Sequence, residues 1–140
     1  MQIEAVMSSP AVTVQLETTI HDAMGQMLEH RVGCVVVVVD GNAVGILTRS
    51  DALRGAYHAG GKLEEIPVER AMSSDLLTTK RSRTVRSALQ TMQTNNIKKL
   101  PVVEDFEPIG IVTMTDIAQT MPEQVREARA NIKRQDDWSN

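Results

Sequence analysis

The sequence repeats itself at a fixed distance of 65 residues, and this repeat constrains the fold more than any other feature. The stretch GILTRSD, which ends at Asp51, matches GIVTMTD, which ends at Asp116, and the MSS tripeptide at Met7 matches the one at Met72. No insertion separates these matches, and the copies are identical at roughly three positions in ten over about fifty residues, well above chance. We therefore predict an internal duplication of one small motif.

Each copy is predicted to contain a helix with one buried face. Thr19 and Thr84 stand where a threonine can cap the start of such a helix. The apolar residues that follow recur at the three-four spacing of an amphipathic helix, so both helices are expected to pack on a core. These residues are Ile20, Ala23, Met24, Met27 and Leu28 in the first copy and Val85, Ala88, Leu89 and Met92 in the second.

Each copy also contains strand patterns. Residues 34–39 and 100–103 are β-branched runs too apolar to have a solvated face, which predicts central strands. Residues 40–42 have hairpin turn chemistry and lead into a strand at residues 43–47. In the second copy, the turn is predicted at residues 106–108, where a proline restricts the backbone. A short polar step and a new helix follow in both copies, so each copy reads β-α-β-β-α.

The predicted fold class is α/β (α+β), a tandem repeat of two β-α-β-β-α motifs followed by a C-terminal polar helix. The first motif with its linker takes residues 1–65, the second takes residues 66–121, and a polar helical tail takes residues 122–140. Residues 58–64 have the glycine pair and the charge of an exposed connection. The tail helix is expected to fray at Asp136-Asp137. Its apolar residues at helical spacing are Val125, Ala128 and Ile132.

Composition and charge narrow the possible partners. The formal net charge is -3 and only three residues are aromatic, Trp138, Tyr57 and Phe106. The chain therefore lacks the excess of basic residues and the aromatic side chains for base stacking that nucleic-acid binding requires, which argues against a nucleic-acid partner. Cys34 is the only cysteine and lies in an apolar run, which predicts a buried thiol in a reducing compartment. No signal peptide is visible and the longest apolar run is too short to span a bilayer. We predict a cytoplasmic protein without a membrane partner.

The repeated T-x-x-D pattern places polar side chains at two helix starts. Thr48 and Thr113 stand at a strand end, and Asp51 and Asp116 fall in the first turn of the helix that follows. A helix start has N–H groups without intrahelical partners and the positive end of the dipole, which suit a phosphate. A carboxylate there can accept two hydrogen bonds from a ribose diol. The pattern fits a nucleotide site, but the same residues are also preferred for capping alone.

The ordered set of motifs resembles a known family. MSSPAVTV, then a helix, then LPVVED and GIVTMTDI in the second copy, is similar to the paired cystathionine-β-synthase (CBS) domains of a Bateman module, over about residues 6–121. The resemblance implies two motifs packed with pseudo-two-fold symmetry through their strands, and two clefts for adenosine-type ligands. It also implies that such modules commonly pair into homodimers.

The resemblance further implies a ligand-binding set in the second motif. There Asp116 would hold a ribose, Thr113 and Thr115 would hold a phosphate, and the lysines at 98 and 99 would be directed at phosphates. The adenine would lie against residues near 75–77 and against Ile97. The full set is Asp75, Leu77, Ile97, Lys98, Lys99, Thr113, Met114, Thr115 and Asp116.

The matching first-motif set departs from the second in its charge. Gly33 and Cys34 stand where the second motif has its lysine pair, and Arg49 is the nearest replacement. The first-motif set implied by the resemblance is Pro10, Val12, Val32, Thr48, Arg49, Ser50 and Asp51.

No pattern for catalysis or metal binding is present. His21, His30 and His58 lack the short spacing of a metal site. The sequence has neither a nucleophile elbow nor a G-x-x-x-x-G-K phosphate loop. We therefore predict a binding module with no catalytic residue, no catalytic cofactor and no metal, and not an enzyme.

Two functions stay open. The first is regulatory binding of AMP, ADP, ATP or S-adenosylmethionine, which shifts the packing of the motifs and is read by an unknown effector protein. The alternative is a ligand-independent structural or dimerisation module. In either case we expect a homodimer that buries the helix faces containing Met24, Met27 and Met92. A nucleic-acid adaptor built on the basic residues of positions 80–86 is a weaker third hypothesis.

Overall fold

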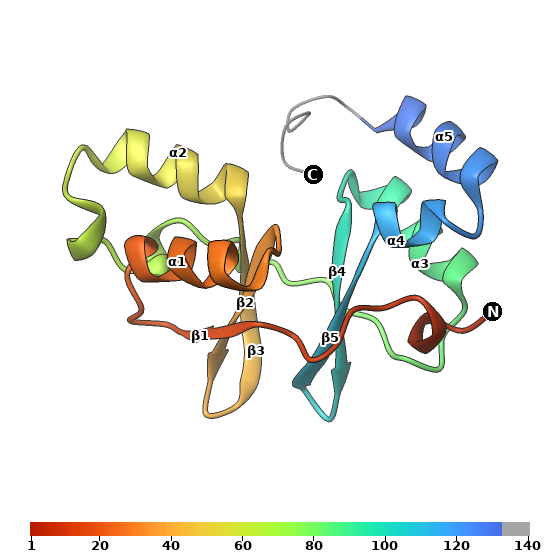
Figure 1. Cartoon of the computed structure of the whole chain (residues 1–140), viewed down its shortest axis with the longest axis horizontal. Helices are drawn as coiled ribbons and strands as arrows, with labels where there is room; N and C mark the ends of the chain where they lie inside the picture. Colours follow the sequence, from red (N-terminus) through yellow and green to blue (C-terminus); the bar gives the residue numbers. More distant parts are fainter. Residues whose placement is uncertain (133–140) are drawn as a thin grey trace. The chain divides into compact units, whose positions relative to one another are not determined.

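The computed structural model describes residues 1–132, and these residues form two compact units (Figure 1). The first unit consists of residues 11–76. The second unit consists of residues 1–10 together with the described residues from 77 onward. Each unit has its own strands, helices and hydrophobic core, as the tandem repeat predicts.

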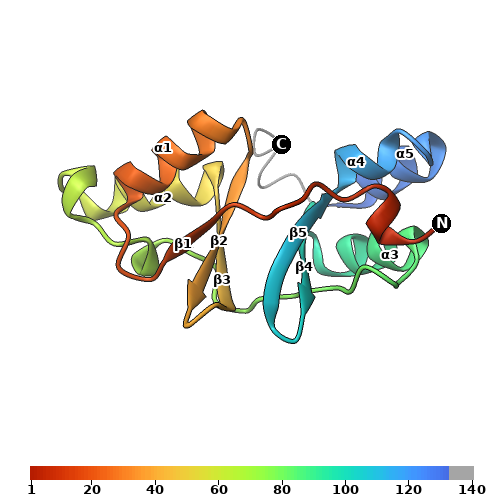
Figure 2. The ribbon, with the colours of Figure 1, turned by 60° about the horizontal axis from the view of Figure 1, so that its bottom comes forward.

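The first unit has a three-stranded sheet with two helices packed on one face of it (Figures 1 and 2). Strand β1 pairs with β2 in parallel, and β2 pairs with β3 as an antiparallel hairpin. Val35 and Val37 of β2 point into the core, where they meet buried residues of both helices. The elements in chain order are β1 (Thr13–Gln15), α1 (Ile20–His30), β2 (Cys34–Val39), β3 (Asn42–Thr48) and α2 (Arg49–Ala59).

The second unit repeats this plan with a smaller sheet. Its β4 and β5 form an antiparallel hairpin, and Leu100 and Val102 take the inward positions that Val35 and Val37 hold in the first unit. The elements in chain order are α3 (Val85–Asn95), β4 (Lys99–Glu104), β5 (Glu107–Thr113), α4 (Met114–Ala118) and α5 (Pro122–Asn131).

The second copy lacks the first strand of the predicted β-α-β-β-α order. At the corresponding place a single parallel bridge joins Thr79 to Val102. In the first unit, the N–H of Val36 donates to the carbonyl of Val12 at 2.9 Å and extends the β1–β2 ladder. The residue that corresponds to Val36 is Pro101, which has no N–H to donate. The strand therefore shrinks to one bridge.

The two predicted helix starts are confirmed. Thr19 accepts a hydrogen bond from the N–H of Asp22 at 3.1 Å, and Thr84 accepts one from the N–H of Ser87 at 3.0 Å. The buried faces of α1 and α3 also follow the predicted spacing, except at Leu28, which is 79% exposed. That prediction was wrong because Leu28 lies at the edge of the apolar stripe of α1, where periodicity does not decide which residues are covered.

Each hairpin turns through two residues with positive φ. In the first unit these are Asp40 (φ 52°) and Gly41 (φ 82°), as predicted. In the second they are Asp105 (φ 49°) and Phe106 (φ 69°), so the turn lies earlier than the predicted residues 106–108, and Pro108 belongs to β5. Two-residue hairpins with positive φ at both positions match the twist of the strands. The twist of the strands thus requires positive φ at Phe106, although phenylalanine rarely adopts this conformation.

The segments that lead into the two repeats are exchanged between the units. In the second unit, the N–H of Val85 donates to the carbonyl of Met1 at 2.9 Å. In the first unit, the N–H of Ile20 donates to the carbonyl of Ile66 at 2.7 Å, which is the same bond shifted by one repeat. Ile3 is accordingly buried in the second core, and the residues around Ile66 are buried in the first. The sequence boundary at 65/66 therefore describes the repeat, whereas the compact units divide at residues 10/11 and 76/77.

The glycine that begins GILT and GIVT lets this exchanged segment approach the hairpin. Ser8 bonds to Ile111 on both sides of its backbone, at 2.8 and 2.9 Å, and an added Cβ at Gly110 would lie 2.6 Å from the Ser8 carbonyl oxygen. Ser73 bonds to Ile46 in the same way, and a Cβ at Gly45 would lie 2.9 Å from its carbonyl oxygen. The MSS and glycine motifs are therefore contact partners.

The C-terminal helix belongs to the core of the second unit. Helix α5 and the residue that follows it carry the predicted apolar stripe, and this stripe is buried, although the sequence predicted a polar helical tail. The predicted fraying point at Asp136-Asp137 lies outside the described residues. The stripe consists of Val125, Ala128 and Ile132. Among the helices of residues 1–132, none is long and apolar enough to cross a membrane.

Candidate functional site

Both T-x-x-D motifs form capping boxes. Oγ1 of Thr48 accepts a hydrogen bond from the N–H of Asp51 at 3.2 Å, and Oδ2 of Asp51 accepts one from the N–H of Thr48 at 3.0 Å. Thr113 and Asp116 make the same pair of bonds at 3.0 and 2.9 Å. The capping role foreseen in the sequence is thus confirmed, and one oxygen of each aspartate is occupied by it.

The residues at the start of β4 lie beside the second of these helix starts. The N–H of Met114 donates to the carbonyl of Lys98 at 2.9 Å, and Lys99 lies directly opposite Thr113 in the β4–β5 ladder. Directly opposite residues of an antiparallel pair put their side chains on the same face. The second unit therefore brings Lys99, Thr113 and Asp116 together, with the backbone of Lys98 beside them.

The first unit has the same backbone arrangement without the positive charge. There the N–H of Arg49 donates to the carbonyl of Gly33 at 3.1 Å, and the residue opposite Thr48 is Cys34, which is buried. The predicted difference between the two sets is thus placed at the strand position that faces the capping threonine. Arg49, the proposed replacement cation, is exposed and belongs to α2.

The two helix starts also differ in the residues between threonine and aspartate. Met114 is 1% exposed and packs in the second core, so its side chain is not available to a ligand, whereas Thr115 is exposed. At the corresponding positions of the first unit, Arg49 is exposed and Ser50 is 4% exposed. The Ser50 Oγ is buried and has no hydrogen-bond partner among residues 1–132. A buried hydroxyl without a partner is costly to the folded protein.

The remaining predicted site residues divide between the units. Ile97 and Val32 are half-buried, and each packs against the core of its own unit next to a helix end. Leu77 is exposed and belongs to the second unit, but Asp75 belongs to the first. The rest of the first-motif set divides likewise, since Val12 lies in the first unit and Pro10 ends the N-terminal segment of the second.

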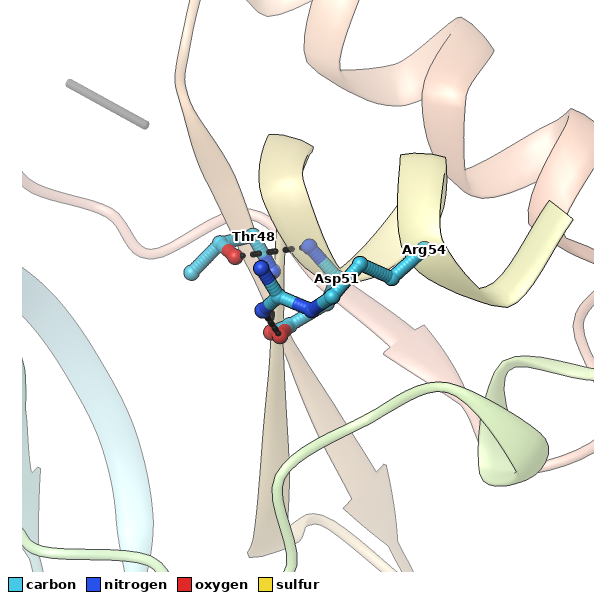
Figure 3. Close-up of polar contacts among 3 residues, drawn as sticks. All are labelled: Thr48, Asp51 and Arg54. Carbon is cyan, nitrogen blue, oxygen red and sulfur yellow. Dashed lines mark hydrogen bonds and ion pairs between the residues drawn. The ribbon is translucent and has the colours of Figure 1, made fainter. Parts of the chain in front are cut away.

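Arg54 contacts the first-motif aspartate, and the motif spacing did not single it out. Its Nη2 donates to Oδ1 of Asp51 at 2.9 Å (Figure 3). The signal was present, because an arginine three residues after an aspartate on a helix lies on the same face as that aspartate. With this contact, both oxygens of Asp51 have protein partners.

The remaining clusters offer less chemistry. Lys80, Arg81, Arg83 and Arg86 are exposed, and Arg81 pairs with Glu104 at 3.2 Å between two half-exposed side chains. Such surface pairs contribute little to stability. Within residues 1–132, no three histidine, cysteine or acidic side chains lie together so that they could hold a metal ion.

Comparison with known proteins identifies the same motifs. The family model of the CBS domain matches the chain twice, over residues 3–57 and 64–123. YhcV, a CBS domain-containing protein of Bacillus subtilis, is 33% identical over 136 residues, which are 95% of this chain and 96% of YhcV.

Solved structures show the same fold. The CBS domain pair of protein MJ0100, in complex with 5′-methylthioadenosine and S-adenosyl-L-methionine, matches with a TM-score of 0.79 and 25% identity over 89% of this chain and 98% of that one. The CBS domain protein TA0289 of Thermoplasma acidophilum matches with a TM-score of 0.83 and 27% identity over 94% of this chain and 75% of that one.

Proposed function

Because this chain belongs to the CBS domain family, we propose that it is a regulatory module that binds an adenosyl ligand and signals to a partner protein. The ligand class is an adenine nucleotide (AMP, ADP or ATP) or an adenosyl thioether or sulfonium compound. The proposal makes the chain a binding module and not an enzyme. A cytoplasmic location is part of the same proposal and comes from the sequence.

The single observation that supports the proposal best is the state of Asp116. One oxygen of this carboxylate caps helix α4, and its Oδ1 makes no hydrogen bond or ion pair with any residue from 1 to 132. A carboxylate oxygen in this position can accept hydrogen bonds from the hydroxyl groups of a ribose. Lys98 and Lys99, beside it, add positive charge of the kind that attracts a phosphate or carboxylate group.

The solved complex of a relative supports the ligand class. The CBS domain pair of MJ0100 holds 5′-methylthioadenosine and S-adenosyl-L-methionine, and both compounds contain an adenosine. The T-x-x-D motif with a neighbouring lysine pair is suited to the ribose and to an acidic group, which AMP and S-adenosylmethionine both have. We therefore include these thio compounds with the nucleotides in the test.

The test is thermal unfolding with S-adenosylmethionine, 5′-methylthioadenosine, AMP, ADP, ATP and GTP. A ligand at about a hundred times its dissociation constant should stabilise the fold by about 2.7 kcal/mol. In Asp116→Asn the shift by the active adenosyl compound should be lost, because the amide carries no charge. Asparagine can still cap the helix through its side-chain oxygen, so the unliganded stability should change by less than about 1 kcal/mol.

The alternative function predicts a different pattern. In a ligand-independent structural module, none of the six compounds shifts the unfolding temperature of the unaltered protein. Asp116→Ala then lowers stability by about 0.5 to 2 kcal/mol as a lost cap and has no binding to abolish. A ligand shift that persists unchanged in Asp116→Asn would contradict the assignment of the site while keeping the ligand class.

We further propose that the chain forms a homodimer. Met27 and Met92 cannot supply the interface, because both are buried in the cores of their own units, and Met24 is half-buried. Leu28 of α1 and Tyr57 of α2 are 79% and 82% exposed, on helices that lie side by side (Figures 1 and 2), and are better candidates. Sedimentation equilibrium should give the mass of two chains, and Leu28→Asp should lower it; a mass of one chain at micromolar concentration would contradict the dimer.

A further inference from the structure

Arg54 holds the one oxygen of Asp51 that capping leaves unused. The two atoms of the ion pair, Nη2 of Arg54 and Oδ1 of Asp51, are 2.9 Å apart (Figure 3). The Asp51 side chain is 12% exposed and that of Arg54 is 49% exposed, so the carboxylate is well shielded while the guanidinium is half in solvent. A charge-assisted bond to a shielded carboxylate is stronger than a pair between two exposed groups.

The position of the second unit that matches Arg54 has no arginine. The residue at the matching position is Gln119, which follows α4 with helical backbone angles (φ -68°, ψ -25°) and is exposed. Its neutral amide cannot form an ion pair with Asp116. The two matched aspartates are therefore equal in their capping bonds and unequal in their second oxygen.

This inequality acts on the group that would hold a ribose. A carboxylate oxygen has two acceptor sites, so an ion pair reduces its capacity for hydroxyl groups without removing it. A ligand whose ribose binds Asp51 must share the carboxylate with Arg54 or displace the Arg54 guanidinium. A displaced guanidinium remains near Asp51 and continues to compete for it.

We propose that Arg54 is a specificity-determining residue that lowers the affinity of the first-motif site, so that the second-motif site is filled first by the adenosyl ligand. This inference rests on the proposed function. The Arg54–Asp51 ion pair would then determine which site fills first. Its effect would act in the same direction as the absence of a lysine at Cys34, the position that matches Lys99.

The test is isothermal titration with S-adenosylmethionine of the unaltered protein and of four variants. Asp116→Asn and Asp51→Asn identify which of the two binding events, seen as heat of binding, belongs to which motif. Arg54→Gln gives the first motif the residue that the second has at the matching position, and Gln119→Arg gives the second motif the residue of the first. Both substitutions lie on exposed or half-exposed side chains, so the fold should survive, and unfolding curves check this.

We expect the tighter heat to vanish in Asp116→Asn. Arg54→Gln should tighten the Asp51-dependent site about fivefold, and Gln119→Arg should weaken the Asp116-dependent site by a similar factor, as loss or gain of one ion pair predicts. The inference is overturned if the tighter site depends on Asp51, or if Arg54→Gln weakens the first site, because Arg54 would then contact the ligand itself. If no variant gives heat with S-adenosylmethionine or with AMP, the proposed function fails and this inference fails with it.

Discussion

Ile3→Ala is expected to lower the free energy of unfolding by about 4 kcal/mol, although Ile3 stands outside every predicted helix and strand. The side chain is 0% exposed and is part of the second core. Removing buried methyl and methylene groups of isoleucine typically costs about 2 to 5 kcal/mol, because the cavity that forms does not fully collapse. Urea unfolding of both proteins, at equal concentration, measures the difference.

The unit that is destabilised by Ile3→Ala shows whether the N-terminal segment packs in the second unit or in the unit of its own repeat. Hydrogen exchange should become faster in β5 and α3, because the N-terminal segment bonds to Ile111, Arg83 and Val85 of the second unit. The matched variant is Val68→Ala, whose residue is equally buried but belongs to the first core. It should instead speed exchange in α1 and β3. Faster exchange of β2 and β3 in Ile3→Ala, with β5 unchanged, would contradict the exchange of segments.

Gly110→Val should destabilise the fold by about 3 kcal/mol. Its Cβ would lie 2.6 Å from the Ser8 carbonyl oxygen, and Ser8 cannot move away cheaply because both its N–H and its carbonyl are hydrogen-bonded to Ile111. Overpacking at such a site typically costs about 1 to 3 kcal/mol, and the branched side chain of valine puts this variant at the upper end. Thermal and urea unfolding measure the effect.

Two glycines serve as controls for this variant. Gly45→Val should cost less, because the nearest atom to the new Cβ is the flexible sulfur of Met72 at 2.7 Å, with the Ser73 carbonyl oxygen at 2.9 Å. A Cβ added at Gly25 in α1 would meet no atom outside the helix backbone within 4 Å, so Gly25→Ala should raise stability by about 0.5 to 1 kcal/mol through helix propensity. Equal losses in Gly110→Val and Gly25→Ala would show that close approach of Ser8 is not the cause.

Much of the fold follows from local signals in the sequence. The caps at Thr19 and Thr84, the strand β2 and the turn at Asp40 are set by residues within a few positions of each other, so period and turn chemistry predict them. The capping boxes at Thr48 and Thr113 are local in the same sense. These motifs were therefore predictable in both their structural and their proposed binding roles.

The features that the sequence did not predict depend on distant residues or on a missing atom. The exchange of leading segments depends on contacts between residues that are far apart in the sequence, such as Ile3 with Arg83 and Ile66 with Ile20, which no local pattern reports. The loss of a strand in the second copy depends on the absent N–H of Pro101. The contact of Arg54 with Asp51 was local, but spacing alone does not say which of two nearby charges an exposed arginine chooses.

The exchange of leading segments also determines how the polypeptide can be divided. A cut in the connection near residue 62, where the sequence repeat suggests a boundary, gives two fragments that each carry a segment belonging to the other's core. Each fragment alone lacks the leading segment that pairs with its hairpin, so the hairpin edge next to Gly45 or Gly110 is left unpaired. Mixing the two fragments should restore both cores at once, so complementation rather than autonomous folding is the behaviour that this connectivity confers on a single repeat.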